Sequence, residues 1–221
     1  KKIRWAIAQF FEKWWWNNYL KNKEPNKYLE WKKAYWVSFL NEIKFPLSSI
    51  GKRCADIGCG PAGIFILSEN TKTEWKAIDP LLKNYQSLDV FKPKNYPNVN
   101  FINSTFEDYK PKILFDTIFC INAINHFISL DENFSKLNKI LKQDGTLILS
   151  TDAHNHKFLK WVLYSLPFDI LHPHQYTLEE YKNKIEKAGF EITQTLLKDK
   201  AFIFSYYIFT LKKKSTFQSQ K

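Results

Sequence analysis

Residues 56–63 read DIGCGPAG and contain Gly58, Gly60 and Gly63. This spacing matches G-x-G-x-x-G, the pattern in which a glycine-rich loop after a strand brings its backbone close to a nucleotide. Glycine suits such a loop because it has no Cβ atom and tolerates positive φ angles. A single match is weak evidence, so the surrounding sequence must decide whether the loop holds NAD, another nucleotide or no ligand.

Short β-rich runs alternate with helical stretches after Gly51. We expect strands at 53–57, 74–79, 99–103, 115–121 and 146–151, and helices at 62–69, within 82–88 and at 131–141. Alternating strands and helices predict parallel βαβ units with right-handed crossovers. The fold class is therefore expected to be α/β, with a doubly wound, Rossmann-like sheet.

The end of the chain departs from this alternation. Thr177 and Glu180 form a capping-box pattern, which predicts a helix at 177–188 that ends at Gly189. Two β-rich runs then follow in succession, at 190–197 and 202–210. They predict a terminal antiparallel hairpin, which brings the sheet to seven strands.

Composition limits the class of protein. The 221 residues are 44% hydrophobic and 25% charged, as in an ordinary globular domain, and no apolar run reaches membrane-spanning length. Three cysteines, an odd number without metal-like spacing, indicate a reducing cytoplasm and no disulfide framework. Methionine is absent even at position 1, so we expect the sequence to be a fragment or a processed product.

The first 50 residues differ chemically from the remainder. They carry ten Lys or Arg residues against four Glu, and six of the eight tryptophans. Aromatic stripes predict helices at 3–20 and 27–44. We favour a helical lid whose aromatic side chains cover the ligand cleft and form a substrate pocket. Peripheral membrane contact through the aromatic helix and an RNA-binding surface are the alternatives.

From about Gly51 to Leu211 the sequence resembles the class I S-adenosylmethionine-dependent methyltransferases. Four motifs in the expected order carry this resemblance: DIGCGPAG (56–63), IDP (78–80), FDTIFCINAINHF (115–127) and LNKILKQDGTLILST (137–151). The resemblance implies an S-adenosylmethionine-binding domain at 51–212, with an N-terminal helical extension at 1–50 and a polar tail at 213–221. A nicotinamide dehydrogenase stays as a formal competitor.

The resemblance also implies where the cofactor binds. It assigns Asp56 to the methionyl ammonium, and a carboxylate at this place suits a cation better than a pyrophosphate. It assigns Asp79 to the two ribose hydroxyls and Pro80 to the adenine. The remaining expected contacts are Gly58, Cys59, Gly60, Ser104, Thr105, Phe106 and Asn122. Glu107 or Asp108 would serve in place of Ser104 with a one-register shift of the alignment.

The acceptor is expected to be a small molecule. The loop after residue 121 lacks the Asn/Asp-Pro-Pro-aromatic signature of nitrogen methylation, and it resembles the branch that methylates small molecules, quinone precursors included. We therefore expect O-methylation of a hydrophobic or aromatic acceptor. An RNA methyltransferase and a non-catalytic cofactor-binding partner protein are the alternatives.

Histidine is the residue type expected to remove the proton of an acceptor hydroxyl. Of the five histidines, we predict His154 as the base and His126 as the second candidate. The pairs HNH (154–156) and HPH (172–174) lack a carboxylate or cysteine that would complete a metal site, so no metal is expected.

Overall fold

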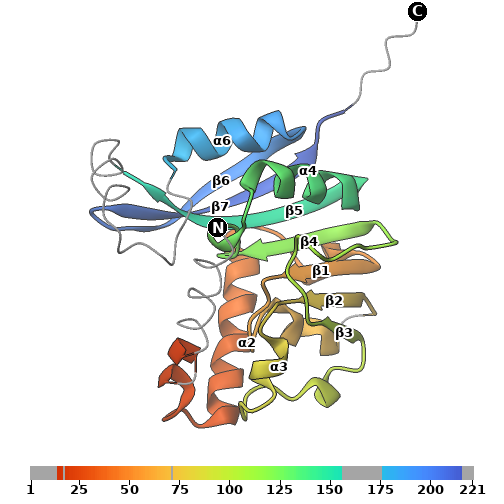
Figure 1. The fold of residues 1–221 in the computed structure, drawn as a ribbon, viewed down its shortest axis with the longest axis vertical. Coiled ribbons are helices and arrows are strands. Elements are labelled where there is room, and N and C mark those ends of the chain that lie inside the picture. Colours follow the sequence, from red (N-terminus) through yellow and green to blue (C-terminus); the bar gives the residue numbers. More distant parts are fainter. Residues whose placement is uncertain (1–13, 17, 71, 156–175, 216–221) are drawn as a thin grey trace, which may run out of the picture.

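Seven strands form one sheet in the order β3-β2-β1-β4-β5-β7-β6 (Figure 1). The structure is a computed structural model and describes residues 14–16, 18–70, 72–155 and 176–215. The strands are β1 Arg53–Ile57, β2 Glu74–Ile78, β3 Val99–Ile102, β4 Phe115–Ile121, β5 Leu141–His154, β6 Phe190–Lys200 and β7 Phe204–Lys213. The first five are parallel and β7 runs antiparallel to both β5 and β6. The doubly wound sheet and its terminal hairpin are thus confirmed.

Both faces of the sheet are covered. The α-helices that lie wholly within the described ranges are α2 Pro25–Glu42, α3 Leu82–Tyr85, α4 Leu130–Ile140 and α6 Leu178–Lys187. Neighbouring strand residues alternate between two core clusters, so Ala55 packs with α4 and α6 while Cys54 packs with α2. Side chains of a strand point alternately to its two faces, and the two clusters therefore lie on opposite faces. The capping box of Thr177 and Glu180 is present at the start of α6.

Three expected elements differ in form. The helix expected at 62–69 is a 3-10 segment, η2 Ile64–Asn70. A buried carboxylate oxygen of Asp56 accepts the backbone N–H of Phe65, which fixes the start of this segment by a tertiary contact. The helix within 82–88 is the short α3. Strand β5 is longer than the expected 146–151, because antiparallel pairing with β7 extends it to His154.

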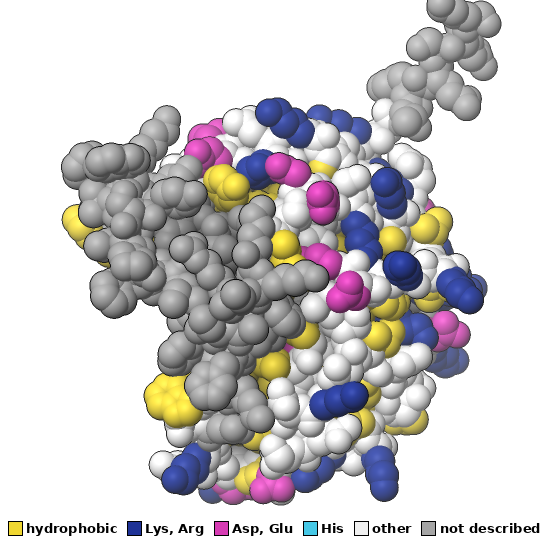
Figure 2. All heavy atoms as spheres, in the orientation of Figure 1, with side chains coloured by type: hydrophobic (Ala, Val, Ile, Leu, Met, Phe, Trp, Pro, Cys, Tyr) yellow, Lys and Arg dark blue, Asp and Glu magenta, His cyan; other side chains and the backbone are white. Residues whose placement is uncertain are grey.

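Part of the expected N-terminal helix lies outside the described residues. Residues 14–16 and 18–20 are helical, whereas 3–13 and 17 are not described. His156, His172, His174 and residues 216–221 of the expected tail also fall outside the described ranges. No described helix has both the length and the hydropathy needed to cross a membrane. On the face that Figure 2 shows, Lys and Arg side chains are dispersed among acidic and apolar ones.

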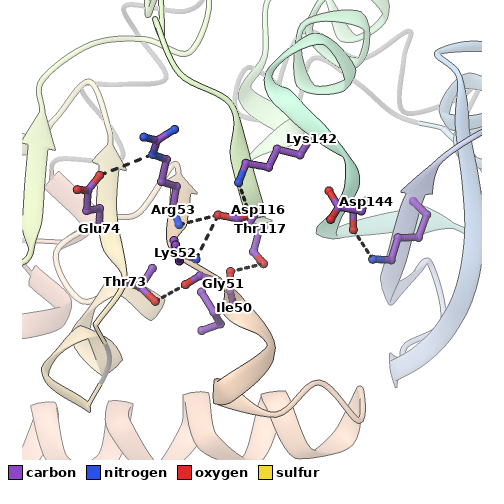
Figure 3. Close-up of polar contacts among 11 residues, drawn as sticks. Ile50, Gly51, Lys52, Arg53, Thr73, Glu74, Asp116, Thr117, Lys142 and Asp144 are labelled. Carbon is purple, nitrogen blue, oxygen red and sulfur yellow. Dashed lines mark hydrogen bonds and ion pairs between the residues drawn. The ribbon is translucent and has the colours of Figure 1, made fainter.

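Polar contacts at the amino ends of the strands fix the segment that leads into β1 (Figure 3). Asp116 accepts from the backbone N–H groups of Lys52 and Arg53 at 3.1 and 2.8 Å, and it pairs with Lys142. Burial alone would raise the pKa of Asp116, but the contacts with Lys142 and the backbone N–H groups outweigh it and hold the pKa below its usual range. These contacts lie at the opposite end of the strands from the glycine loop.

Candidate cofactor and acceptor site

Two adjacent pockets lie at the carboxyl ends of β1, β2 and β4. The β2-side pocket is lined by seven of the expected cofactor residues: Gly58, Asp79, Pro80, Ser104, Thr105, Phe106 and Asn122. The α2-side pocket has a volume of about 650 Å³ and is lined by the others, Asp56, Cys59 and Gly60, together with Gly58 and Asn122. Gly58, Asn122 and His126 line both pockets, so the two share one wall.

The glycine loop uses its own amide groups. Gly58 and Gly60 have φ angles of +67° and +60°, a region in which glycine is the least strained residue. The N–H groups of Gly58 and Cys59 donate to Ile78 O at 2.8 and 3.3 Å, and that of Gly60 donates to Asp79 Oδ2 at 3.0 Å. A pyrophosphate site offers such N–H groups to the ligand. This loop therefore does not have the anion-binding arrangement of a dinucleotide site.

Asp79 lies at the end of β2 and faces the β2-side pocket. It is 5% exposed and accepts N–H groups of Gly60 and Leu81. Burial raises its pKa to about 6, although these backbone donors and Tyr85 oppose the rise. Each carboxylate oxygen has a second lone pair available, so Asp79 can still accept hydrogen bonds from two hydroxyl groups of a ligand.

Asp56 is the second buried carboxylate and is 3% exposed in the α2-side pocket. Burial raises its pKa to about 7, and the charge of Asp79 adds to the rise, while the backbone N–H of Phe65 and the charge of Lys32 lower it. Asp56 therefore caps local backbone through Oδ2, but its carboxyl also forms part of the pocket wall. A ligand cation beside it would stabilise the ionised form.

The segment after β3 lines the opposite wall of the β2-side pocket. Thr105 exchanges hydrogen bonds with Asp108, which is not among the lining residues. Glu107 does line the pocket, and its Oε1 accepts from Ile128 N and Asn133 Nδ2 at 2.9 and 2.8 Å. The ring of Phe106 stacks on that of Phe127 with centroids 5.4 Å apart. The wall thus has an apolar part and, in Glu107, an acidic one.

Asn122 has a backbone conformation that is rare for a residue with a side chain. Its φ angle is +52°, and its N–H donates to Ser150 O and Ser150 Oγ at 3.2 and 2.9 Å. Ser150 Oγ also lies 2.6 Å from the hydroxyl of Tyr206 on β7. Backbone strain of this kind often occurs where a loop meets a ligand.

The two predicted catalytic histidines lie in different places. His126 ends η4 (Ile124–His126) and lines both pockets. His154 ends β5, is 3% exposed, and its ring centroid lies 4.3 Å from that of Phe204. His154 lines neither pocket, whereas His126 lines both. The role of each remains a prediction.

Several pocket residues escaped the sequence reasoning. Lys32 of α2 and Tyr206 of β7 line the α2-side pocket with Tyr35, Trp36 and the tryptophans 14–16. The aromatic stripe of residues 27–44 gave a general expectation of an aromatic wall. Nothing in the sequence distinguishes Lys32 from its neighbour Lys33, because only the packing of α2 decides which lysine faces the pocket.

The donor set fits S-adenosylmethionine better than a dinucleotide. Two buried carboxylates face the pockets, where they can accept from ribose hydroxyls and from an ammonium. A pyrophosphate would be repelled by them and would find the N–H groups of Gly58, Cys59 and Gly60 already paired. Among the described residues, no group of three or more His, Cys, Asp and Glu is arranged to hold a metal ion. The three cysteines are buried and free of disulfides.

Comparisons with known proteins agree with this geometry. A family described as "Methyltransferase domain" matches residues 28–195. A ubiquinone biosynthesis O-methyltransferase of Rickettsia typhi is 26% identical over 113 residues, which are 51% of this chain and 46% of that protein. Its counterpart in Rickettsia bellii is 31% identical over 98 residues, 43% of this chain and 40% of the relative. The chain thus matches less than half the length of these curated relatives.

Solved structures show the same fold at low identity. The YcgJ protein of Bacillus subtilis superposes with a TM-score of 0.64 and 16% identity, over 82% of this chain and 99% of that one. A TehB-like S-adenosylmethionine-dependent methyltransferase of Corynebacterium glutamicum gives 0.59 and 14%, over 95% and 99%. Because the family match spans most of the chain, the protein belongs to the methyltransferase-domain family, among the class I S-adenosylmethionine-dependent methyltransferases.

Proposed function

We propose that the chain transfers a methyl group from S-adenosylmethionine to a hydroxyl oxygen of a small acceptor with an apolar or aromatic body. The observation that carries the proposal is the aromatic α2-side pocket, which shares Gly58, Asn122 and His126 with the pocket expected to hold the nucleoside. The oxygen as the methylated atom is supported by the names of the Rickettsia relatives, which are O-methyltransferases.

The chain's own residues would divide the work as follows. The bound cofactor supplies a methyl carbon that its sulfonium activates for in-line displacement. Aromatic side chains of α2 and of residues 14–16 would bind the acceptor ring and exclude water from it. His126 would accept the hydroxyl proton, since its side chain lies at the junction of the two pockets. Asp79 would hold the ribose hydroxyls and Asp56 the methionyl ammonium.

The N-terminal segment is proposed to act as the lid of the acceptor pocket. Its described residues supply Trp14, Trp15 and Trp16 to the pocket wall. Helix α2 packs into the same core cluster as β1 and β2, and the family match begins at residue 28, within α2. The division into 1–50, 51–212 and 213–221 stays a prediction.

A peripheral membrane contact is a second proposal, for a chain otherwise expected in the cytoplasm. Trp14, Trp15 and Trp31 are 59%, 48% and 53% exposed, and two of them line the α2-side pocket. Exposed tryptophans with nearby lysines suit the headgroup region of a bilayer, from which a lipid-soluble acceptor would reach the pocket. Flotation with anionic vesicles, repeated with Trp14→Ala and Trp15→Ala, tests the contact, and unchanged flotation would refute it.

Calorimetry tests the cofactor first. S-adenosylmethionine and S-adenosylhomocysteine are expected to bind in the micromolar range and NAD is not. Methyl transfer is then measured with radiolabelled cofactor and simple phenols, catechols and a short RNA as acceptors. Labelling of the RNA alone would establish the alternative RNA methyltransferase, and cofactor binding without any transfer would support the non-catalytic protein.

The two candidate histidines are tested by separate substitutions. His126→Gln is expected to lower turnover by about 10²–10⁴-fold while cofactor affinity is retained, which is the usual contribution of a general base. His154→Gln should leave turnover within a few-fold of wild type if that residue only packs against Phe204. A reversed result would restore His154 as the base.

A further inference from the structure

Ser150 and Tyr206 form a pair of hydroxyl groups beside the exit of β4. Ser150 Oγ lies 2.6 Å from Tyr206 Oη, and it accepts the backbone N–H of Asn122 at 2.9 Å. Asn122 and Tyr206 both line the α2-side pocket, whereas Ser150 is fully buried. The Tyr206 hydroxyl therefore lies where the wall of this pocket meets the exit of β4.

The register of β5 and β7 places this pair. Tyr206 is paired with Asp152 of β5, and Ser150 of β5 is paired with Ile208, two residues further along β7. Tyr206 and Ile208 lie on one face of the strand, so Tyr206 is a diagonal neighbour of Ser150. Tyr206 packs against the core cluster that contains α2 residues, whereas Tyr207 packs against the cluster on the other face. The hairpin thus brings Tyr206 to the pocket.

The number of hydroxyl hydrogens decides the direction of this hydrogen bond. Ser150 has one hydroxyl hydrogen and no access to water, and among the described residues Tyr206 Oη is the acceptor within its reach. If Tyr206 donated to Ser150, the Ser150 hydrogen would be buried without an acceptor, which is costly and rare in native structures. Ser150 therefore donates to Tyr206, and the hydrogen of the Tyr206 hydroxyl is available to a ligand in the pocket.

The Tyr206 hydroxyl remains protonated. Burial raises the pKa of Tyr206 above its usual range, and the hydrogen bond with Ser150 only partly opposes the rise. Tyr206 is therefore a neutral donor of hydrogen bonds. A hydrogen bond from such a donor becomes stronger when the accepting oxygen gains negative charge, as a hydroxyl oxygen does when it loses its proton.

We propose that Tyr206 binds the acceptor by donating a hydrogen bond to the oxygen that receives the methyl group. The proposal rests on the proposed function, because that function places the acceptor in the α2-side pocket. The oxygen bonds to the methyl carbon as the carbon–sulfur bond of the cofactor breaks, the acceptor's hydroxyl proton passes to the base, and Tyr206 keeps its own proton. The hydrogen bond orients the oxygen and stabilises the negative charge that deprotonation leaves on it.

Three small probes of similar shape separate this hydrogen bond from packing. Phenol carries a hydroxyl, anisole carries an oxygen that can only accept, and toluene carries no oxygen. Equilibrium dialysis measures the binding of each probe with S-adenosylhomocysteine present and again without it. Tyr206→Phe is expected to bind phenol about three- to tenfold more weakly than wild type and anisole about two- to threefold more weakly, because one hydrogen bond is lost. Toluene should bind equally to both proteins.

Two further variants serve as controls. Tyr207→Phe removes the hydroxyl of the neighbouring tyrosine on the other face of β7, and it should bind all three probes as wild type does. Ser150→Ala removes the group that donates to Tyr206, while the Asn122 N–H keeps the backbone oxygen of position 150 at 3.2 Å. It should bind phenol within about twofold of wild type, because the Tyr206 hydrogen is still present.

Each outcome supports or overturns the proposal. Equal phenol binding by wild type and Tyr206→Phe overturns it, as does a loss that is equal for phenol and toluene, which would indicate packing. A loss for phenol without one for anisole would make Tyr206 an acceptor, and stronger phenol binding by Ser150→Ala would make it the donor to Ser150; both results overturn the proposal. Absence of phenol binding by the wild type also does.

Failure of the proposed function gives a different result. Wild type that binds neither S-adenosylmethionine nor S-adenosylhomocysteine refutes that function, whereas the dialysis without cofactor still reports on Tyr206. Thermal unfolding identifies a variant that does not fold. If Tyr206→Phe is one, the double variant with Ser150→Ala takes its place, because it also removes the hydroxyl hydrogen left without an acceptor, and Ser150→Ala is then its reference.

Discussion

Two features of Gly58 exclude a side chain: its positive φ angle and its close packing against Ala123. Comparing Gly58→Ala with Gly60→Ala separates their costs. The φ angle of Gly58 is +67°, and a Cβ atom added there would lie less than 3.0 Å from Ala123 Cβ. The left-handed conformation costs an alanine about 1–2 kcal/mol. Forcing a methyl group into a packed contact costs about 1–3 kcal/mol more. Gly58→Ala is therefore expected to lower the free energy of unfolding by about 2–5 kcal/mol.

Gly60→Ala is the matched control. Its φ angle of +60° is nearly the same, but among the described residues a Cβ there would meet only the Trp16 ring, at 3.5 Å, an ordinary contact. It should lose about 1–2 kcal/mol, the backbone cost alone. Urea unfolding followed by circular dichroism measures both variants at one pH. Calorimetry then shows whether Gly58→Ala also weakens cofactor binding, as expected when the loop moves away from Ala123.

Ala123→Gly in the Gly58→Ala background removes the clashing methyl group. The double-mutant cycle should give a favourable coupling of about 1–3 kcal/mol, and the backbone cost should remain. If Gly60→Ala cost as much as Gly58→Ala, or if Ala123→Gly gave no rescue, the contact with Ala123 would not be the cause.

Three further changes test other parts of the site. Asp79→Asn should weaken S-adenosylmethionine binding by about 10–100-fold in calorimetry, since it removes a charged acceptor of hydrogen bonds; unchanged affinity would contradict its assignment to the ribose. Asp56 has its folded pKa raised to about 7, so the folded state binds a proton that the unfolded chain has lost. The free energy of unfolding therefore falls by up to roughly 4 kcal/mol as the pH rises from about 4 to 7. Urea unfolding across that range should show a smaller dependence on pH for Asp56→Asn than for wild type. Asp116→Ala should cost about 1–3 kcal/mol of stability, because Lys142 and two backbone N–H groups lose their acceptor, while cofactor affinity stays unchanged.

The positions of the expected cofactor residues at one edge of the sheet follow from topology, and their binding roles stay predictions. Asp56 and Asp79 come at or just after the ends of parallel strands, and the carboxyl ends of such strands meet at one edge of the sheet. The glycine spacing, the strand alternation and the capping box of Thr177 are local patterns, and local patterns are readable without the fold. All ten expected cofactor residues accordingly line one or other pocket.

The remaining features depend on packing that no local pattern records. The orientation of α2 places Lys32 in the pocket that Asp56 also lines, and the terminal hairpin brings Tyr206 beside the exit of β4. The contacts around β5 bury His154 against Phe204, whereas η4 leaves His126 at the pocket. Sequence alone therefore determined the fold and the cofactor edge through strand order and glycine spacing. Only the tertiary structure decided which lysine and which histidine line the α2-side pocket, because side chains distant in sequence meet there.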